Sequence, residues 1–301
     1  MKRRKKNQTK KEIRILLEKF NIYQLLTLTF YHKGENIMKT SKILAVLIAA
    51  LLVIFVKSNV YAQDDLGTVL SYMNTDSAKQ YSQVLTNAMS SNVNSGMFQA
   101  LKPGNKFSVY FGVKACGTFL NDDEQLPGGL KSLTVVPLAM VQLGAGTVAG
   151  TDAFVRFLPS VSIGSYASIS AWGMGVQHNL AKDFKKFPLE VIFRLAYHKM
   201  SIDDSKDVQV AALNSWSQSL IIGKQVSIIT FYTSLQYENS TCDVKYTDRQ
   251  NGVKTMKFSL QNENNIKVAA GFNLKAGPVN LNADYNFGKQ NAISFGLGFG
   301  F

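Results

Sequence analysis

A glycine-rich stretch, Gly144-Ala145-Gly146, superficially matches a dinucleotide-binding loop. Such a loop requires a helix directly after it, because the helix N-terminus binds the pyrophosphate. The residues that follow, from Asp152 to Pro159, alternate like a β-strand and stop at a proline. We therefore interpret the stretch as a turn between strands, and we expect the protein to bind no cofactor.

Two histidines, His178 and His198, raise the question of catalysis, since Ser165, Ser170 and Asp183 are near them in the sequence. A hydrolase of the α/β type would hold its serine in a nucleophile elbow, and that spacing is absent. Neither histidine has a second ligand at the spacing of a metal site. We therefore expect no enzymatic activity and no metal, with His178 as an interfacial polar residue and His198 as a hydrogen-bonding group.

The cysteines Cys116 and Cys242 could form a disulfide in an exported protein, because oxidising compartments permit the bond. Their Cα atoms would have to lie within about 7 Å of each other. The strands expected to carry them are the first and the seventh of ten, which are not neighbours. Unpaired thiols are the favoured interpretation, and a bridge stays open.

The residues from Gly277 to Phe301 show the pattern on which the fold prediction depends. Apolar and polar residues alternate with a period of two, which indicates strands with one apolar face. The apolar positions are Val279, Leu281, Ala283, Tyr285, Phe287, Ile293, Phe295, Leu297, Phe299 and Phe301. Nearly every other strand repeats the pattern, and nothing else in the chain could cover so much apolar surface. A closed barrel resolves this, with apolar residues facing lipid and polar residues facing the lumen.

The predicted fold is therefore all-β, an antiparallel transmembrane barrel of about ten strands after a short N-terminal helical segment. Each strand is long enough for a tilted span of about 9–11 residues, and an even number places both barrel ends on one side. Short turns such as Gly223-Lys224 are expected on the periplasmic side, and the long 117–132 loop outside. The strands are expected at 106–116, 133–146, 151–162, 165–179, 188–200, 206–221, 224–247, 253–275, 278–287 and 291–301. Because 133–146 and 206–221 alternate poorly, the number could differ by two.

Charged side chains are expected on the inner face, because a charge facing lipid costs about 2–4 kcal/mol near the membrane midplane. The lumen-facing candidates are Tyr110, Lys114, Arg156, Glu190, Arg194, His198, Lys267 and Asp284. The aromatic end of the chain, Phe299 and Phe301, resembles the assembly signal of bacterial outer-membrane barrels.

The first 62 residues have the pattern of a leader. Residues 1–37 are basic, without an apolar period, and are expected to be an upstream extension before the true start. Residues 38–62 match a signal peptide, with two lysines, an apolar run of 14 residues from Ile43 to Val56, and a cleavage site ending at Ala62. This predicts export to the outer membrane. A basic cytoplasmic domain with a signal anchor is the alternative.

Removing this leader removes most of the positive charge. Residues 1–37 have a net charge of +7 and residues 38–62 add three lysines, so +3 of the total of +13 remains on the other 239 residues. A basic protein would otherwise suggest a nucleic-acid partner. We expect none.

The segment 63–104 differs from the rest because its apolar residues recur at helical spacing. Thr75 or Asp76 could cap the helix, which should end near Asn94. The apolar positions that would pack into the barrel are Tyr81, Val84, Leu85 and Met89. Its polar face carries Ser, Thr, Asn and Gln rather than Lys and Arg, which argues against a membrane-surface anchor. We expect a plug in the barrel mouth or a periplasmic segment, followed by the barrel at 105–301.

Several short motifs span residues 63–301: Asn94-Ser95-Gly96-Met97-Phe98, Lys102-Pro103, Pro137-Leu138-Ala139-Met140, Gly150-Thr151-Asp152, Arg156-Phe157-Leu158-Pro159 and Trp172-Gly173-Met174-Gly175-Val176-Gln177-His178. In this order and spacing they resemble an uncharacterised family of Gram-negative outer-membrane barrels, known as a domain of unknown function. The resemblance implies the barrel and supplies no activity. More distantly, a helical segment before a barrel looks like long-chain fatty-acid transporters and the related shuttle protein of type IX secretion.

Three functions are compatible with these features. The first is a narrow or plugged channel or transporter for small, hydrophobic molecules. The second is a structural, assembly or secretion partner without transport activity, and the third is a barrel enzyme acting on lipids. The expected partners are outer-membrane lipid, the barrel-assembly machinery during biogenesis, and a small hydrophobic ligand.

We predict that the mature protein begins at Gln63, because the cleavage site ends at Ala62 after an apolar run of signal-peptide length. The intact mass of protein extracted from outer membranes should match residues 63–301. Peptides from residues 1–37 in the same membrane fraction would contradict both the cleavage site and the start at Met38.

We also predict that deletion of Phe301 lowers the amount of protein in the outer membrane more than Phe107→Ala does. Both changes remove an aromatic ring, but the last strand must be delivered and paired before the barrel can close. Immunoblots of outer-membrane fractions measure the two amounts. Equal losses would mean that Phe301 is an ordinary strand residue.

Overall fold

The computed structural model describes residues 65–96, 107–121, 124, 134–146, 150–163, 166–183, 188–248 and 254–300. The expectations for the leader, for 97–106 and for Phe301 lie outside these residues. The elements are α4 (Leu66–Ser71), α5 (Thr75–Asn94), β1 (Ser108–Phe119), β2 (Val135–Gly146), β3 (Thr151–Ile163), β4 (Ala167–Asn179), the 3-10 helix η2 (Leu180–Asp183), β5 (Glu190–Asp203), β6 (Gln209–Val226), β7 (Ile229–Asp248), β8 (Lys254–Gln261), β9 (Ile266–Ala276), β10 (Val279–Phe287) and β11 (Ala292–Gly300).

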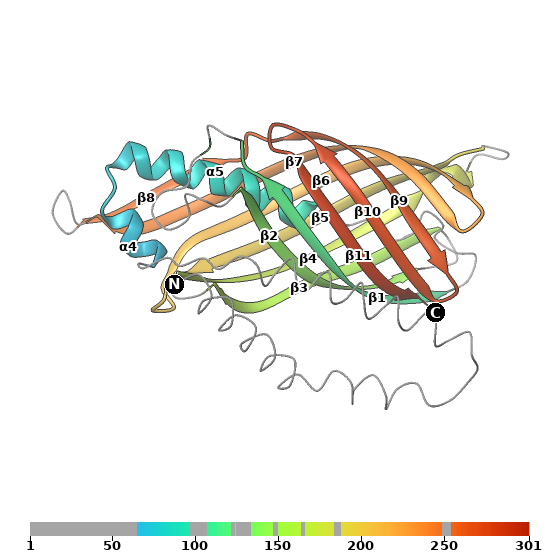
Figure 1. Cartoon of the computed structure of the whole chain (residues 1–301), viewed down its shortest axis with the longest axis horizontal. Helices are drawn as coiled ribbons and strands as arrows, with labels where there is room; N and C mark the ends of the chain where they lie inside the picture. Colours follow the sequence, from blue (N-terminus) through green and yellow to red (C-terminus); the bar gives the residue numbers. More distant parts are fainter. Residues whose placement is uncertain are drawn as a thin grey trace, which may run out of the picture. The chain divides into compact units, whose positions relative to one another are not determined.

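The strands form one closed antiparallel barrel (Figure 1). Neighbouring strands follow the order β6-β5-β4-β3-β2-β1-β11-β10-β9-β7, and β7 pairs with β6 to complete the circle. Because β8 and β9 pair with different parts of β7, the two strands together occupy one position in the barrel wall. The barrel wall therefore has ten strand positions, and the predicted fold class is confirmed.

The two ends of the barrel differ, and we name them by what they hold. The terminal rim contains Ser108 at the start of β1 and Gly300 at the end of β11. Two of its turns have only two residues, between β6 and β7 and between β9 and β10. The loop rim is the opposite end, where β1 finishes at Phe119 and residues 120–134 connect it to β2.

The predicted single strand at 253–275 is wrong, because residues 262–265 interrupt it. The Asn262 side-chain oxygen accepts a hydrogen bond from Asn264 N at 2.9 Å, and Asn264 Oδ1 accepts one from Lys289 N at 2.8 Å. Asparagine side chains that bond nearby backbone groups compete with the ladder of a sheet. The interruption leaves β8 on the loop-rim half of β7 and β9 on the other half.

The turn predicted at Gly223-Lys224 is also misplaced. β6 begins at Gln209 rather than at residue 206 and continues to Val226, where a tight turn leads to β7. Ser227 adopts φ 57° in this turn, the left-handed conformation that glycine adopts most readily, so no glycine marks the turn in the sequence. The hairpin is therefore longer than predicted at the terminal rim.

The outer face of the barrel is apolar, as lipid contact requires. Side chains on β1 show the pattern, since Val109, Phe111 and Val113 are each at least 40% exposed. An aromatic cluster lies on the outside of β4, β5 and β6, where the Tyr197 ring centroid is 5.7 Å from that of Trp172 and 4.9 Å from that of Trp216. Such rings are typical of the level where a barrel meets the membrane interface.

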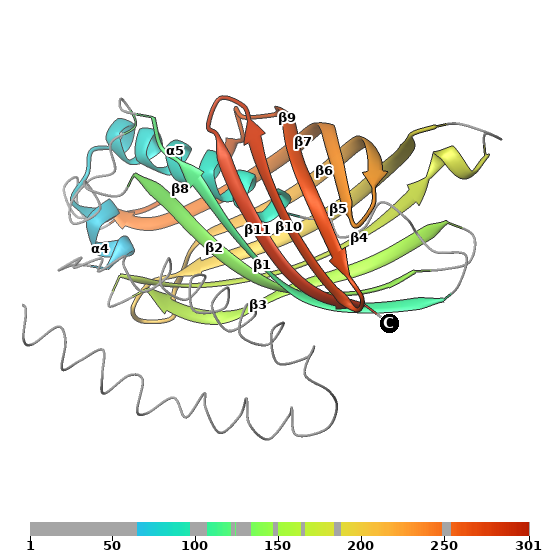
Figure 2. The same cartoon turned by 45° about the vertical axis from the view of Figure 1, so that its right-hand side comes forward.

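Both helices belong to the loop-rim end, away from the end of β11 (Figures 1 and 2). α5 begins after Asn74, whose side-chain oxygen accepts a hydrogen bond from Ser77 N at 2.8 Å. The predicted cap at Thr75 or Asp76 is wrong by one or two residues, because Asn74 is the last residue in an extended conformation. Within the described residues, neither helix is long and apolar enough to cross a membrane.

The inner face of the barrel is apolar near the loop rim and polar further in. Val136, Leu138 and Met140 of β2 are buried, and the last two belong to the cluster that packs with α4 and α5. Ala211 and Leu213 do the same on β6. Their inner faces therefore contact apolar partners instead of water, which explains why 133–146 and 206–221 alternate poorly.

Candidate functional site

The C-terminal part of α5 lies inside the barrel and is held by polar side chains. Asn94 Nδ2 donates to Ser215 Oγ at 2.7 Å, and Asn94 Oδ1 is 3.2 Å from His198 Nδ1. Asn92 Nδ2 donates to Val136 O at 2.7 Å. Arg156 Nη1 donates to Val93 O at 2.7 Å, which places a cation at the negative end of the helix dipole. The seat therefore involves β2, β3, β5 and β6.

A buried ion pair lies beside this seat. Lys267 Nζ and Glu238 Oε1 are 2.8 Å apart, and both side chains are completely buried. Glu238 also accepts hydrogen bonds from Ser90 of α5 at 3.0 Å and from Gln236 at 2.7 Å. The carboxylate thus connects the helix to β7 and β9, and its several donors offset the cost of burying it.

Three more cations share the lumen near the end of α5. Lys114 donates to Asn282 Oδ1, and the Arg194 guanidinium donates to Gln177 Oε1 at 3.4 Å. Arg156 completes the group, and two nitrogens of Arg156 and one of Arg194 are buried without a hydrogen-bond partner. The carboxylate of Asp284 opposes them and accepts a hydrogen bond from Tyr232 at 3.0 Å. The lumen is therefore a polar and ionic interior.

The structure places the predicted lumen residues on the inner face, with differences in depth. Tyr110 is half-buried and packs against Phe154 and Ala196, while Glu190 is half-buried at the terminal rim and accepts a hydrogen bond from Asn179. The fully buried members are Lys114, Arg156, Arg194, His198, Lys267 and Asp284. Phe299 is half-buried on β11.

The predicted helix positions also lie against the barrel interior. Tyr81, Val84 and Met89 are buried in the apolar cluster at the loop rim, and Leu85 packs against it while half-buried. Polar positions of α5 are buried as well, which the helical spacing of apolar residues did not indicate. Gly96 follows the helix with φ 62°, and an added Cβ would meet Ser294 at 3.1 Å, so this close approach requires glycine.

Two residues of the site were not predicted from the sequence. The alternation of Gln236, Glu238 and Ser240 could have indicated that the Glu238 side chain points into the barrel. Its partner Lys267 could not be predicted, because the pairing depends on the register of β7 with β9. Asp65 caps helix α4, which was not predicted, by accepting a hydrogen bond from Thr68 N at 2.7 Å. The one indication in the sequence was an aspartate at the position where a helix cap would stand.

The residues considered for redox and metal chemistry are separate. Cys116 and Cys242 are both buried free thiols. His178 on β4 contacts Thr151, with 2.8 Å between Nδ1 and Oγ1, far from the seat of His198 in the pairing pattern. Among the described residues, no three His, Cys, Asp or Glu side chains are grouped as a metal site would require.

The spaces beside α5 in the lumen are small. A cavity of about 20 Å³ adjoins Asn94, Gly96 and Arg194 at the end of α5. A cleft of about 280 Å³ at the loop rim is lined by α4, Lys206 and Lys245. A larger space, about 890 Å³, is an apolar groove on the lipid-facing side of β1 to β6.

We predict that Glu238→Gln lowers the free energy of unfolding by about 3–5 kcal/mol, because Lys267 would keep its buried charge without a carboxylate. The loss of the folded band on heating in detergent measures this. Glu263→Gln is the control, since its pair with Lys289 is half exposed and worth less than about 1 kcal/mol. Equal shifts in the two variants would contradict a structural role for the buried pair.

Two solved structures are among those to which the chain is similar. The barrel is similar to Ail, the attachment invasion locus protein of Yersinia pestis, with 10% identity, a TM-score of 0.33, and 65% of this chain and 99% of that chain covered. It is similar to the translocator domain of the autotransporter NalP from Neisseria meningitidis, with 13% identity, a TM-score of 0.32, and 81% and 99% covered. No curated protein matches the sequence.

The model of the family of unknown function DUF6588 matches residues 117–301, and the chain belongs to this family.

Proposed function

We propose that the protein is an outer-membrane pore that its own N-terminal helix keeps closed. The observation that carries this is the position of α5, whose last turns bond to inner-face groups of β2, β3, β5 and β6. A barrel of ten strands is only slightly wider than the eight-stranded size that side chains fill. A helix in that lumen leaves little room for permeation.

The inner surface favours polar solutes. If α5 withdraws, the wall around its seat includes the cations of Lys114, Arg156 and Arg194 with Asp284 opposite. Small anions are the solutes that such a group attracts, because its three cations outnumber its one carboxylate. The hydrophobic ligand expected from the sequence has less support, since the large apolar groove faces lipid.

The second candidate is a structural or assembly partner without transport. The buried pair between Glu238 and Lys267, bonded to Ser90, favours it because such a seat could be permanent. Outer-membrane lipid and the barrel-assembly machinery are partners in both proposals. Neither proposal includes a catalytic step or a cofactor.

We predict that the whole chain shows little steady conductance in planar bilayers, while a chain lacking residues 64–103 conducts or flickers open. The reason is that the deletion removes the helix that occupies the lumen. Heat-modifiable mobility on gels shows whether the shortened barrel has folded. A folded deletion variant as silent as the parent would contradict the pore and favour the structural role.

A reversible lock tests the same point without deletion. The Thr86 side chain of α5 is within hydrogen-bonding reach of the Cys242 thiol, so Thr86→Cys should form a disulfide to β7. Cys116→Ala removes the other thiol, and Glu238→Gln loosens the seat. This chain should open in bilayers under reductant and stay closed when oxidised. Equal opening in both states would mean that helix movement does not gate the barrel.

A further inference from the structure

The start of the described chain lies at the loop rim. Leu66 N donates to Tyr166 O at 2.9 Å, and Tyr166 belongs to the turn between β3 and β4. Asp65 Oδ2 accepts from Ser205 Oγ at 3.0 Å, in the connection between β5 and β6. Both connections are at the rim opposite to Ser108 and Gly300.

The acidic cap of α4 remains ionised near neutral pH. Burial alone would raise the pKa of Asp65, but hydrogen bonds from Thr68 and Ser205 and the charge of Lys206 outweigh it, so the pKa is lowered. A lowered carboxyl pKa contributes stability at neutral pH that is lost only in acid. The contact between α4 and the loop rim is therefore present under ordinary conditions.

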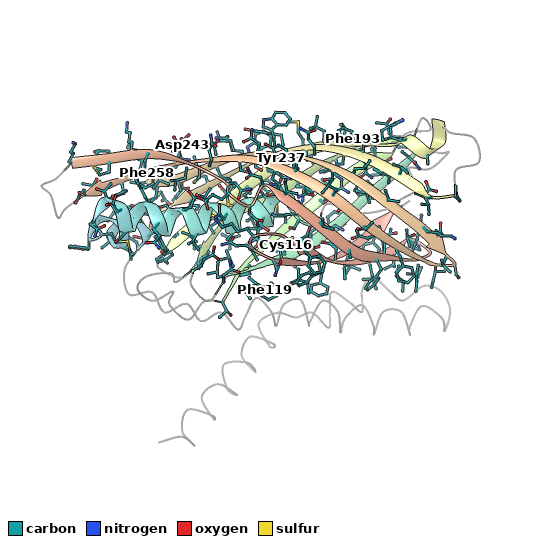
Figure 3. The ribbon with its side chains drawn as sticks, turned by 90° about the horizontal axis from the view of Figure 1, so that it is seen from above. Cys116, Phe119, Phe193, Tyr237, Asp243 and Phe258 are labelled. Atoms are coloured by element: carbon teal, nitrogen blue, oxygen red, sulfur yellow. The ribbon has the colours of Figure 1, made fainter. Side chains whose placement is uncertain are left out.

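The contacts of α5 show its direction. The hydroxyls of Tyr81, near its start, and Tyr166 at the loop rim are hydrogen-bonded. Gln83, half a turn later, donates to Gln261 O at the end of β8 at 2.8 Å. Asn94, at its end, bonds to Ser215 in the middle of β6. Figure 3 shows α5 beside the part of the sheet that carries Asp243 and Phe258, running toward Cys116.

The two rims can be assigned to the two sides of the membrane. In single-chain outer-membrane barrels the rim with both barrel ends and the short turns is periplasmic, and the longer loops are extracellular. Here the terminal rim has the two-residue turns, and the loop rim has the 120–134 connection and the projecting hairpin of β7 and β8. The loop rim therefore faces outward.

We propose that the barrel carries its own N-terminal segment to the cell surface, with α5 left in the lumen and Asp65 and α4 displayed at the outward-facing loop rim. After Gly96, which is inside the barrel, the chain reaches Phe107 at the terminal rim, so the segment enters from the periplasmic side and runs outward toward its N-terminus. The activity is the threading and display of a polypeptide, and it does not require that the barrel ever opens to solutes.

Single cysteines in the full chain test this with a membrane-impermeant maleimide on intact cells, because the native thiols are buried. Lys206→Cys marks the loop rim and Ile228→Cys marks the terminal rim, since both positions are exposed. Asp64→Cys should react on intact cells like Lys206→Cys, while Ile228→Cys should react only after permeabilisation. A protease-accessible epitope inserted between Gln63 and Asp64 gives the same answer by antibody.

The outcomes separate this proposal from the closed pore. Reaction of Asp64→Cys only after permeabilisation, with Lys206→Cys accessible, overturns it even if the barrel is silent in bilayers. Surface reaction of Ile228→Cys overturns the assignment of the rims and the proposal with it. Surface reaction of Asp64→Cys together with a silent 64–103 deletion supports display and contradicts the pore.

Discussion

The constraint on which the structure depends is that no backbone group can stay unpaired in hydrocarbon. Pairing of β1 with β11 and of β6 with β7 satisfies it by closing the sheet into a ring, and β8, which pairs with β7 alone, lies at the loop rim. Closure also creates an interior that is too small for bulk water and too large to be filled by the strands alone. The N-terminal helix fills this interior, and its residue types match the side chains that it contacts there.

The interior has two zones with different physical chemistry. Near the loop rim, Leu138, Met200 and Leu213 pack with Tyr81 and Met89, so burial of apolar surface holds α5 in place. Further in, Ser90 bonds to Glu238 and Asn94 to Ser215, and the Val93 carbonyl accepts from Arg156, so hydrogen bonds specify the position of the helix. The apolar zone supplies most of the binding energy, and the polar zone fixes how deep the helix sits.

The sequence predicts the strands well for a physical reason. Lipid outside and polar contacts inside impose the same contrast on each strand, so β10 and β11 could be read by their period of two. The contrast disappears where a helix contacts the inside, as at Leu138 of β2 and Leu213 of β6. Side-chain partners could not be predicted in the same way, because the approach of Lys267 to Glu238 depends on the interruption at residues 262–265, which sets the register of β9.

The unequal strand lengths give the molecule a lopsided profile. β10 and β11 have nine residues each, which is about the thickness of the membrane, whereas β6 has 18 and β7 has 20. At a rise of about 3.3 Å per residue, the longer strands extend well past the headgroups on one flank only. The ends of these long strands form a wall beside the first turns of α5, and the strands of the opposite flank extend no further than the membrane surface. An approaching macromolecule would thus reach α5 from the flank of the short strands, because β7 and β8 cover the other side of the helix.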